Sequence, residues 1–406
     1  MKILQLANKI PYPPRDGGAI ATLNISLGLA ELGHEVTVLG MNTPKHFTDI
    51  SALPPKIKNT IRIFDVEVDT DINLWYAFTN LLFSKLPYNA TRFFSRKFEK
   101  QLIGLLKKEH FDIIQLEGLY LCFYIDTIRK YSKALISLRA HNIEYEIWER
   151  SANFEKNYFK RKYFYLLARR IRRFELNYLN KYDLLLPITS RDARKYNRMG
   201  NQLPSQTIPV GYDLDNLSLK KGNVKFPSLF FIGTLDWFPN QEGLIWFLEN
   251  VWIELLEMNP GLSFHIAGRN APLKMKKLFR KYRNVVFHGE VEDGELFIRE
   301  NAIMIAPLFS GSGMRVKIIE GMAMGKTIVT TSIGAEGIDV VHEHNIIIED
   351  LSFDFIAQIN ALVRDKKRFE RIGRNAAIFI QSHYNNKTIS KTLAEFYARK
   401  VQLICK

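Results

Sequence analysis

Short apolar runs alternate with longer segments whose apolar residues recur every three or four positions. Residues 2–7 and 35–39 are two such runs, and residues 19–32 between them have helical spacing. Short apolar strands that alternate with amphipathic helices are typical of a parallel sheet covered by helices on both faces. The pattern therefore predicts an α/β fold that begins with a buried strand.

The same alternation continues along the chain and restarts once. Residues 208–213 resemble a crossover linker, which divides the chain into domains at 1–210 and 211–385. The last helix, at about 386–406, is expected to pack back on the first domain. The further strands expected are 111–116, 134–138, 184–188, 228–232, 262–267, 284–288, 303–307 and 327–331, and one long helix is expected at 241–257.

Polar residues and glycines follow several strands of the first half. Gly17 and Gly18 lie between the first strand and the first helix, where a glycine loop can approach a phosphate or simply form a turn. His141 and Asn142 follow the strand at 134–138, and Glu117 follows the strand at 111–116. Because ligands bind at the carboxyl ends of parallel strands, His141 is a candidate to hydrogen-bond a sugar hydroxyl or stabilise developing charge.

The second half has equivalent positions. Gly233, Gly268 and Val291 each lie just after a predicted strand. The segment that starts at Gly233 is a candidate to line the cleft, and a turn with a core tryptophan explains it equally well. The backbone groups of Gly268 and Val291 are candidates to hold a nucleobase, although each is a weak signal alone.

The segment 311–320 concentrates the most chemistry. Gly311, Ser312, Gly313 and Met314 form a small-residue loop between a strand and a helix. Arg315 and Lys317 follow as two cations, and Glu320 as a carboxylate. A helix N-terminus with two cations suits a diphosphate, and a nearby carboxylate can accept hydrogen bonds from ribose hydroxyls. The segment therefore predicts binding of a nucleoside diphosphate group, and a routine strand-to-helix turn with solvated charges is the alternative.

Composition agrees with a globular protein of two domains. The chain has 406 residues, of which 47% are hydrophobic and 24% charged. Its two cysteines, Cys122 and Cys405, lie far apart and outside any zinc-like spacing, so neither a disulfide framework nor a metal site is expected. The start of the chain resembles a buried strand rather than a signal peptide, and no apolar run is long enough to span a bilayer. A cytoplasmic location is expected.

Positive charge is concentrated in one region. The formal net charge is +15, and residues 151–200 hold thirteen Lys or Arg against four Asp or Glu. Within 160–173 the cations are interleaved with aromatic and aliphatic residues, which suits the surface of an anionic membrane. A solvated helix is the alternative. Nucleic acid is not expected as a partner, because no nucleic-acid-binding motif accompanies the basic patch.

Several motifs together resemble family 4 glycosyltransferases of the GT-B fold. "ELGHEVTVLG" is similar to the end of that family's first helix and second strand, and "AHNIE" to its acceptor-side histidine loop. "IPVGYD" resembles the family's crossover, and "KIIEGMAMGKTIVTTSIGAEGI" its donor-binding helix and next strand. The subgroup with "GTLDWFPN" and "GSGMRVKIIE" is often associated with bacterial polysaccharide biosynthesis.

The resemblance implies two Rossmann-like α/β/α domains that face each other across a cleft. It implies that Gly17 and Gly18 border the donor phosphates, that His141 contacts the transferred sugar, and that Arg315 and Lys317 bind the diphosphate. Glu320 would bind the ribose. The family usually has an acid where this chain has Ser312.

The activity implied is metal-independent, retaining transfer from a nucleotide sugar to a glycan or lipid-linked acceptor. The nucleotide sugar is a co-substrate, and no cofactor is expected. Two alternatives remain from the sequence: a nucleotide-sugar epimerase of the same fold, and a non-catalytic subunit or sensor that binds a nucleotide sugar.

Overall fold

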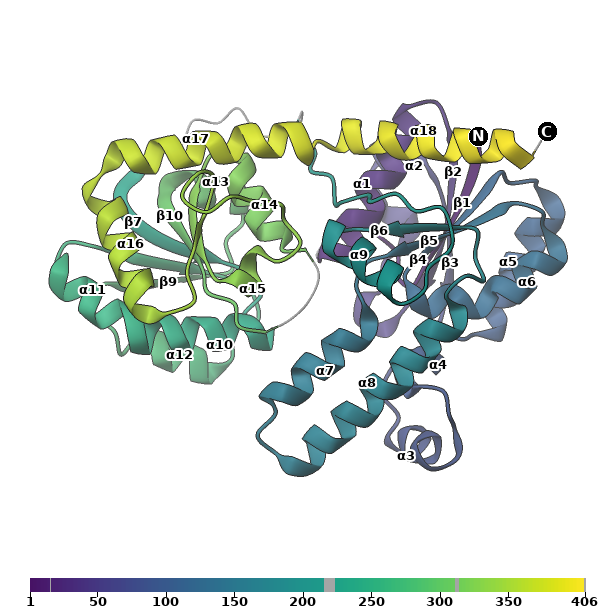
Figure 1. Cartoon of the computed structure of the whole chain (residues 1–406), viewed down its shortest axis with the longest axis horizontal. Coiled ribbons are helices and arrows are strands. Elements are labelled where there is room, and N and C mark those ends of the chain that lie inside the picture. Colours follow the sequence, from purple (N-terminus) through teal and green to yellow (C-terminus); the bar gives the residue numbers. More distant parts are fainter. Residues whose placement is uncertain (15, 215–222, 311–313, 405–406) are drawn as a thin grey trace. The chain divides into compact units, whose positions relative to one another are not determined.

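The protein divides into two units, each built on its own parallel sheet. The computed structural model describes residues 1–14, 16–214, 223–310 and 314–404 (Figure 1). The first unit takes Met1–Gly211 and the segment that begins at Asn386, and the second takes most of the chain between them, from Tyr212 to Asn385. The C-terminal helix therefore belongs to the first unit.

The first unit has a six-stranded sheet in which every pairing is parallel. The strand order is β3-β2-β1-β4-β5-β6. The strands are β1 (Lys2–Ala7), β2 (Glu35–Asn42), β3 (Arg62–Glu67), β4 (Ile113–Glu117), β5 (Leu135–Ala140) and β6 (Leu184–Pro187).

Helices cover both faces of this sheet. One core lies under α5 and α8, and the other lies under α1, α2 and α18, so that successive residues such as Ile3 and Leu4 point to opposite cores. Helices α7 and α8 form a hairpin that extends away from the sheet, with α3 beside α8 (Figure 1). The helices are α1 (Gly17–Glu31), η1 (Pro44–His46), η2 (Ile50–Ala52), α2 (Pro55–Thr60), α3 (Leu74–Phe83), α4 (Tyr88–Thr91), α5 (Arg96–Lys108), η3 (Leu119–Tyr124), α6 (Ile125–Tyr131), α7 (Glu144–Phe154), α8 (Tyr158–Tyr178), α9 (Ser190–Arg198) and α18 (Asn386–Ile404).

The second unit repeats the same design with a second parallel sheet. Its strand order is β12-β11-β10-β7-β8-β9. The strands are β7 (Lys225–Ile232), β8 (Phe264–Ala267), β9 (Val285–Gly289), β10 (Asn301–Ala306), β11 (Thr327–Thr330) and β12 (Ile347–Ile348). The helices are α10 (Phe238–Phe247), η4 (Leu248–Trp252), α11 (Ile253–Met258), α12 (Leu273–Phe279), α13 (Gly294–Glu300), α14 (Val316–Ala323), α15 (Ser332–Ala335), α16 (Ser352–Arg364) and α17 (Lys366–His383).

Each sheet reverses its strand order once, and these two points position the candidate sites. The first strand of each unit pairs with the second strand on one side and with the fourth on the other, so the connections leave in opposite directions. The switch points are β1/β4 in the first unit and β7/β10 in the second. Ligands of such sheets bind beside the carboxyl ends of the strands at this point.

The predicted fold class of parallel α/β units is confirmed, with differences in detail. The expected helix at 241–257 is longer and has three parts, since α10 starts at Phe238 and passes through the π-helical η4 into α11. Strands β3 and β12 were not predicted. β3 alternates apolar with charged residues at a sheet edge, and β12 has only two residues, so neither forms an apolar run.

Helix α18 is held on the first unit by close contact with α1. A Cβ atom on Gly28 of α1 would lie 2.1 Å from Ser390 Oγ and 2.8 Å from Ser390 Cβ, both on α18. Asn386 also donates a hydrogen bond to the carbonyl of Asn24 at 2.8 Å. The two helices therefore approach as closely as they do only because residue 28 lacks a side chain.

We predict that Gly28→Ala destabilises the first unit by about 1 to 3 kcal/mol, because the added methyl group overpacks the contact with Ser390. Gly104→Ala is the matched control in helix α5. An added Cβ there meets nothing within 4 Å, so the change should stabilise by about 0.5 to 1 kcal/mol. Urea unfolding followed by circular dichroism measures both, and equal effects of the two substitutions would contradict the close contact.

Candidate functional site

The face of the first sheet under α1 and α18 carries polar residues toward its carboxyl ends. Gln5, Gln115 and Ser137 are register neighbours on β1, β4 and β5, and all three are fully buried. Two residues further on, Glu117 of β4 is paired in register with Arg139 of β5. The sheet thus brings a carboxylate and a guanidinium side by side inside the protein.

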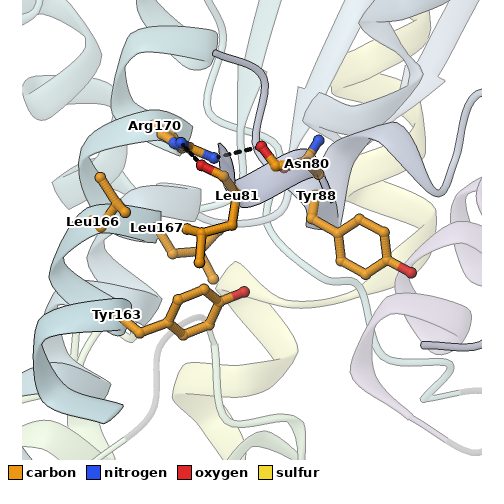
Figure 2. A pocket seen from close by; sticks show the side chains of 7 residues that line it. All are labelled: Asn80, Leu81, Tyr88, Tyr163, Leu166, Leu167 and Arg170. Atoms are coloured by element: carbon orange, nitrogen blue, oxygen red, sulfur yellow. Dashed lines mark hydrogen bonds between the residues drawn. The ribbon is translucent and has the colours of Figure 1, made fainter. Parts of the chain in front are cut away.

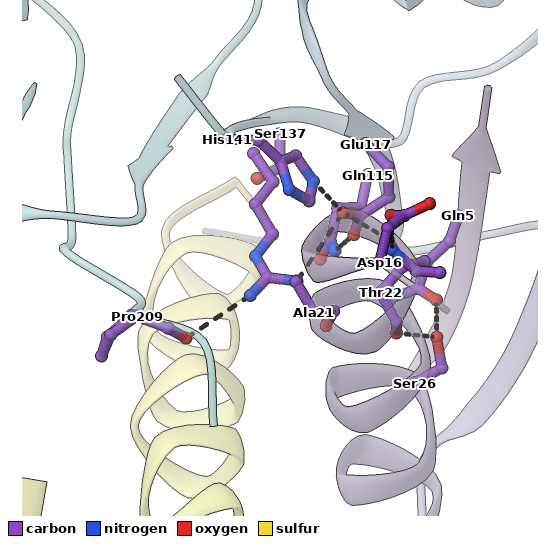
Figure 3. A network of polar contacts seen from close by, with 12 residues as sticks. Gln5, Asp16, Ala21, Thr22, Ser26, Gln115, Glu117, Ser137, His141 and Pro209 are labelled. Carbon is purple, nitrogen blue, oxygen red and sulfur yellow. Dashed lines mark hydrogen bonds and ion pairs between the residues drawn. The ribbon is translucent and has the colours of Figure 1, made fainter. Parts of the chain in front are cut away.

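Glu117 is the centre of a group that we call the Glu117 cluster: Glu117, Arg139, His141, Thr22 and Gln115 (Figure 3). His141 Nε2 lies 2.7 Å from Glu117 Oε2, and the Thr22 hydroxyl donates to the same oxygen at 3.1 Å. Gln115 donates to Oε1, and Arg139 Nη1 lies 3.6 Å from Oε2. The carboxylate therefore has partners on both oxygens.

These partners keep Glu117 ionised. Burial alone would raise the pKa of its carboxyl group, but the Arg139 guanidinium and the hydrogen bond with His141 outweigh it and lower the pKa to about 2. Because an ionised carboxylate only accepts hydrogen bonds, Nε2 of His141 must carry a proton. In neutral imidazole this leaves Nδ1 as an acceptor.

Two further carboxyl groups lie near this cluster: Glu144 lies close to His141 and Asn142, and Glu175 lies close to Glu144. Burial raises the pKa of Glu144, which accepts a hydrogen bond from the Tyr120 hydroxyl at 3.0 Å. Burial, with a smaller contribution from the charge of Glu144, raises the pKa of Glu175 to about 8. Glu175 therefore holds a proton at neutral pH.

The N-terminus of α1 includes both glycines of the predicted loop. The helix starts at Gly17 rather than at residue 19, because Asp16 caps it by accepting a hydrogen bond from the amide of Ala19 at 3.0 Å. Lys9 Nζ lies 2.6 Å from both Asp16 oxygens and balances the carboxylate. Gly17 and Gly18 thus lie at the carboxyl end of β1, next to a capping acid that was not predicted as a site residue.

In the second unit, Gly233 and Gly268 lie side by side after β7 and β8. A Cβ atom on Gly268 would lie 2.0 Å from the carbonyl oxygen of Gly233. Gly233 itself has a φ of 158°. The backbone packing therefore explains the glycine at 268 without a ligand, while Val291 follows the edge strand β9, away from the switch point.

Lys317, on the first turn of α14, points toward α10. Its ammonium donates to Asn240 Oδ1 at 2.8 Å and lies 4.4 Å from the centre of the Phe231 ring. Burial, together with a smaller effect of the neighbouring Arg315 charge, lowers the pKa of Lys317 to about 7. Arg315, at the N-cap position of α14, is itself 5% exposed.

Glu320 lies one turn further along α14. Burial raises its pKa to about 7, with a contribution from Glu295, whereas a hydrogen bond with the Tyr212 side chain acts in the opposite direction. We call Arg315, Lys317, Glu320 and Asn240 the Lys317 cluster.

The structure thus groups most of the predicted site residues into two sets, one in each unit. Glu117, His141 and Asn142 lie together in the first unit, and Arg315, Lys317 and Glu320 lie together in the second. Gly311, Ser312 and Gly313 are outside the described residues, and Met314 is a buried residue just before the cluster.

Four residues in or beside these clusters were not predicted as site residues: Arg139, Thr22, Asn240 and Tyr212. Arg139 was expected after its strand but belongs to β5 and is fully buried. A charged residue at an inward position of a buried strand is a detectable sign of such a pair, since unpaired charges are costly there. Tyr212 lay in the predicted linker, where the sequence carries no comparable sign.

Over the residues that the structure describes, no three His, Cys, Asp or Glu side chains gather closely enough to hold a metal ion. None of the helices placed by the structure has the length and apolar character needed to span a bilayer.

A family model matches most of the second unit. Residues 226–365 match a family model described as "Glycosyl transferases group 1". The second unit carries a group 1 glycosyltransferase domain. The prediction of a glycosyltransferase is thereby confirmed at this level, and the Lys317 cluster lies within that domain.

One curated relative and several solved structures are similar to this chain over almost its whole length. The chain is 26% identical over 403 residues to an "Uncharacterized 44.6 kDa protein in cps region" of Klebsiella pneumoniae, covering 97% of this chain and 98% of that protein. It is similar to Anabaena Alr3699/HepE in complex with UDP (TM-score 0.70, 15% identity, covering 98% and 100% of the two chains). It is also similar to sucrose-phosphate synthase (tll1590) from Thermosynechococcus elongatus (TM-score 0.70, 15% identity, 99% and 100%). These likenesses confirm the predicted GT-B fold.

We predict that Glu117→Gln removes a pH-dependent part of the stability of the first unit. The pKa of Glu117 falls from 4.5 to about 2 on folding, so its contribution is present above about pH 4.5 and is lost as the pH falls toward 2. At neutral pH the loss should be roughly 3 kcal/mol.

Urea unfolding across this pH range measures the effect. The difference in stability between wild type and Glu117→Gln should shrink as the pH is lowered. Glu149→Gln, at an exposed position of α7, is the control and should follow the wild type. A constant difference between wild type and Glu117→Gln would contradict the ionised, paired state of Glu117.

Proposed function

We propose that the chain is a retaining, metal-independent glycosyltransferase of family 4. It would transfer a sugar from a nucleotide-sugar donor to a glycan or lipid-linked acceptor in the assembly of a polysaccharide or glycoconjugate. The donor serves as co-substrate, and no cofactor takes part.

The observation that carries this proposal is the charge of the Lys317 cluster. Two cationic residues lie close together at the start of α14, one of them almost completely buried, and each raises the electrostatic energy of the other. A diphosphate bound there would relieve this repulsion and accept charge-assisted hydrogen bonds. Glu320 and Tyr212, one turn away, supply groups that can hydrogen-bond the ribose hydroxyls.

The similar proteins support a nucleotide-sugar donor and a role in polysaccharide assembly. The Anabaena protein is described in complex with UDP and with UDP-glucose, which favours a uridine nucleotide as the donor. The relative in a cps region favours a role in polysaccharide assembly.

We assign the chemistry to electrostatic stabilisation of the leaving group. Arg315 and Lys317 would neutralise charge that develops on the departing diphosphate. His141, with its orientation fixed by Glu117, would hydrogen-bond the transferred sugar. In a front-face reaction the departing phosphate accepts the proton of the acceptor hydroxyl, so no side-chain nucleophile is required.

We further propose that the protein works at an anionic membrane surface on the cytoplasmic side. In α8 the cations Lys160, Arg161 and Lys162 are exposed, as are Arg169, Arg172 and Arg173. Exposed basic side chains near an anionic leaflet each contribute about 1 kcal/mol of attraction. A lipid-linked acceptor would be held at the same surface.

We predict that a UDP-sugar raises the melting temperature of the wild type and not that of Arg315→Ala. A ligand at a hundred times its Kd adds about 2.7 kcal/mol of stability. In single-turnover transfer, loss of one charge-stabilising donor should raise the barrier by about 2 to 4 kcal/mol.

The panel should include UDP-, GDP-, dTDP- and CMP-sugars and the free nucleotides. Arg280→Ala, an exposed position of the same unit, is the matched control and should behave as the wild type. A shift without any turnover would favour the non-catalytic, nucleotide-sugar-binding alternative. Equal shifts for wild type and Arg315→Ala would remove Arg315 from the site.

We also predict that binding of UDP-glucose weakens above pH 7. The pKa of Lys317 is lowered to about 7, so the ammonium is charged below this pH and neutral above it. Since the diphosphate favours the cation, Kd should rise by up to about tenfold per pH unit above pH 7. Lys317→Arg keeps its charge and should flatten this profile. Calorimetry at several pH values measures Kd, and a flat wild-type profile would exclude Lys317 from phosphate binding.

A further inference from the structure

The segment around α3 exposes an apolar surface that the catalytic proposal does not use. Residues 72–83 form a stretch of twelve residues without a charged side chain. Trp75 is 69% exposed and Phe83 86% exposed. Ile72, Tyr76, Phe78, Leu82 and Leu86 are further large side chains of the segment that are exposed. Clustered exposure of this kind marks a surface that binds something apolar.

The segment is anchored, so its exposure is not that of a frayed loop. Arg92 donates to the carbonyl of Thr70 at 2.7 Å and closes the base of the segment. The Tyr88 hydroxyl accepts a hydrogen bond from the amide of Asn73 at 3.0 Å, and Asn73 caps the start of α3. The helix is therefore held at its base and at its N-terminus.

Helix α8 holds the other end of α3. Arg170 donates to the carbonyl of Asn80 at 3.2 Å and to that of Leu81 at 2.8 Å, which lie in the last turn of α3 (Figure 2). Carbonyls in this turn have no partner within their own helix, and a cation there also complements the helix dipole. Leu81 lines a small cavity together with Tyr163, Leu166 and Leu167 of α8 (Figure 2). Leu81 thus faces α8, whereas Trp75, Phe78 and Phe83 are left in solvent.

Positive charge accompanies this apolar surface. Arg170 lies within the basic stretch of α8, whose exposed cations include Arg169 and Arg173. The tip of α8 adds exposed aromatics, because Tyr158 and Phe159 precede the cations Lys160, Arg161 and Lys162. Asp69 and Asp71, on either side of Thr70, are the only acidic residues between position 69 and the start of α3. The pairing of exposed aromatic and basic side chains complements an anionic lipid surface, where aromatic rings reside at the headgroup level.

We propose that α3 inserts its exposed aromatic side chains into the headgroup layer of an anionic bilayer, with Arg170 fixing α3 to the basic helix α8. This deepens the proposed role of α8 at a membrane, because α3 adds a larger set of exposed apolar side chains to the cations and the two exposed aromatics of α8. Apolar insertion by α3 adds a contribution that salt does not screen. It is independent of the nucleotide site.

Flotation of the full chain with vesicles tests the proposal. The vesicles are of phosphatidylcholine alone, or of equal parts of phosphatidylcholine and phosphatidylglycerol. The wild type should float with the mixed vesicles. The triple variant Trp75→Ser, Phe78→Ser and Phe83→Ser should lose at least tenfold in affinity, with an unchanged melting temperature, because these side chains are exposed.

Matched controls distinguish insertion by α3 from unspecific adsorption through other exposed apolar side chains. Leu273→Ser with Phe353→Ser removes two side chains of the second unit that are each 75% exposed, and this variant should float as the wild type does. Tryptophan emission of the wild type should shift to the blue on mixed vesicles. The shift should be much smaller in Trp75→Phe, which should still float.

Three results would overturn the proposal. The first is equal flotation of the wild type and the α3 triple variant. The second is absence of vesicle binding by the wild type. The third is a wild-type dimer that the triple variant dissociates, which would assign the surface to a second copy of the chain. The UDP-sugar thermal shift, measured on the same triple variant, reports the nucleotide site separately, so failure of α3 and failure of the proposed transferase activity are distinguishable.

Discussion

The buried pair of Glu117 and Arg139 is the constraint on which the first unit depends. Both side chains are almost completely removed from water, and neither charge is tolerable there without the other. Parallel register places them side by side, and helix α1 then contributes Thr22 to the carboxylate and the carbonyl of Ala21 to the guanidinium at 2.8 Å. Helix α18 completes the arrangement, since Tyr397 donates to Gln115 at 2.6 Å, and Gln115 in turn donates to Glu117. The last helix of the chain is thus connected through two hydrogen bonds to the carboxylate that orients His141.

The second unit differs in its electrostatics, because it places like charges close together. In the first unit a buried charge is neutralised by the protein itself, whereas the Lys317 cluster brings two cations together and lowers the pKa of one of them. The amide of Asn240 and the ring of Phe231 are weak substitutes for an anion. Two cations held close together favour the binding of an anion, because a bound anion would relieve their mutual repulsion. The two clusters therefore differ in the way expected of a positioning group and a binding group.

The sequence predicted the elements that bury a continuous apolar run, and it located the residues at their carboxyl ends. The sequence did not predict a strand in which apolar and charged side chains alternate. Strand β3 was missed because Arg62, Asp65 and Glu67 interrupt its apolar residues. Arg139 was placed after its strand because a buried arginine contradicts the expectation for a strand interior, and only the register with Glu117 resolves that contradiction. Contacts between distant segments, such as Tyr397 with Gln115 or Arg170 with the end of α3, leave no local pattern, since each depends on how separate elements pack.

The exposed and the buried cations of this chain suit two different kinds of ligand, a membrane surface and a diphosphate. Residues 151–200 account for nine of the fifteen net positive charges, and in α8 most of the cations are exposed. The cations of the Lys317 cluster are few, and burial intensifies their field at short range. Exposed cations act weakly and additively, which suits a broad surface of many anionic headgroups. Buried cations act strongly on one bound group, which suits a diphosphate. The basic character of the chain is therefore no guide to its nucleotide site, because the charges that raise the isoelectric point and those that would bind the donor belong to different units.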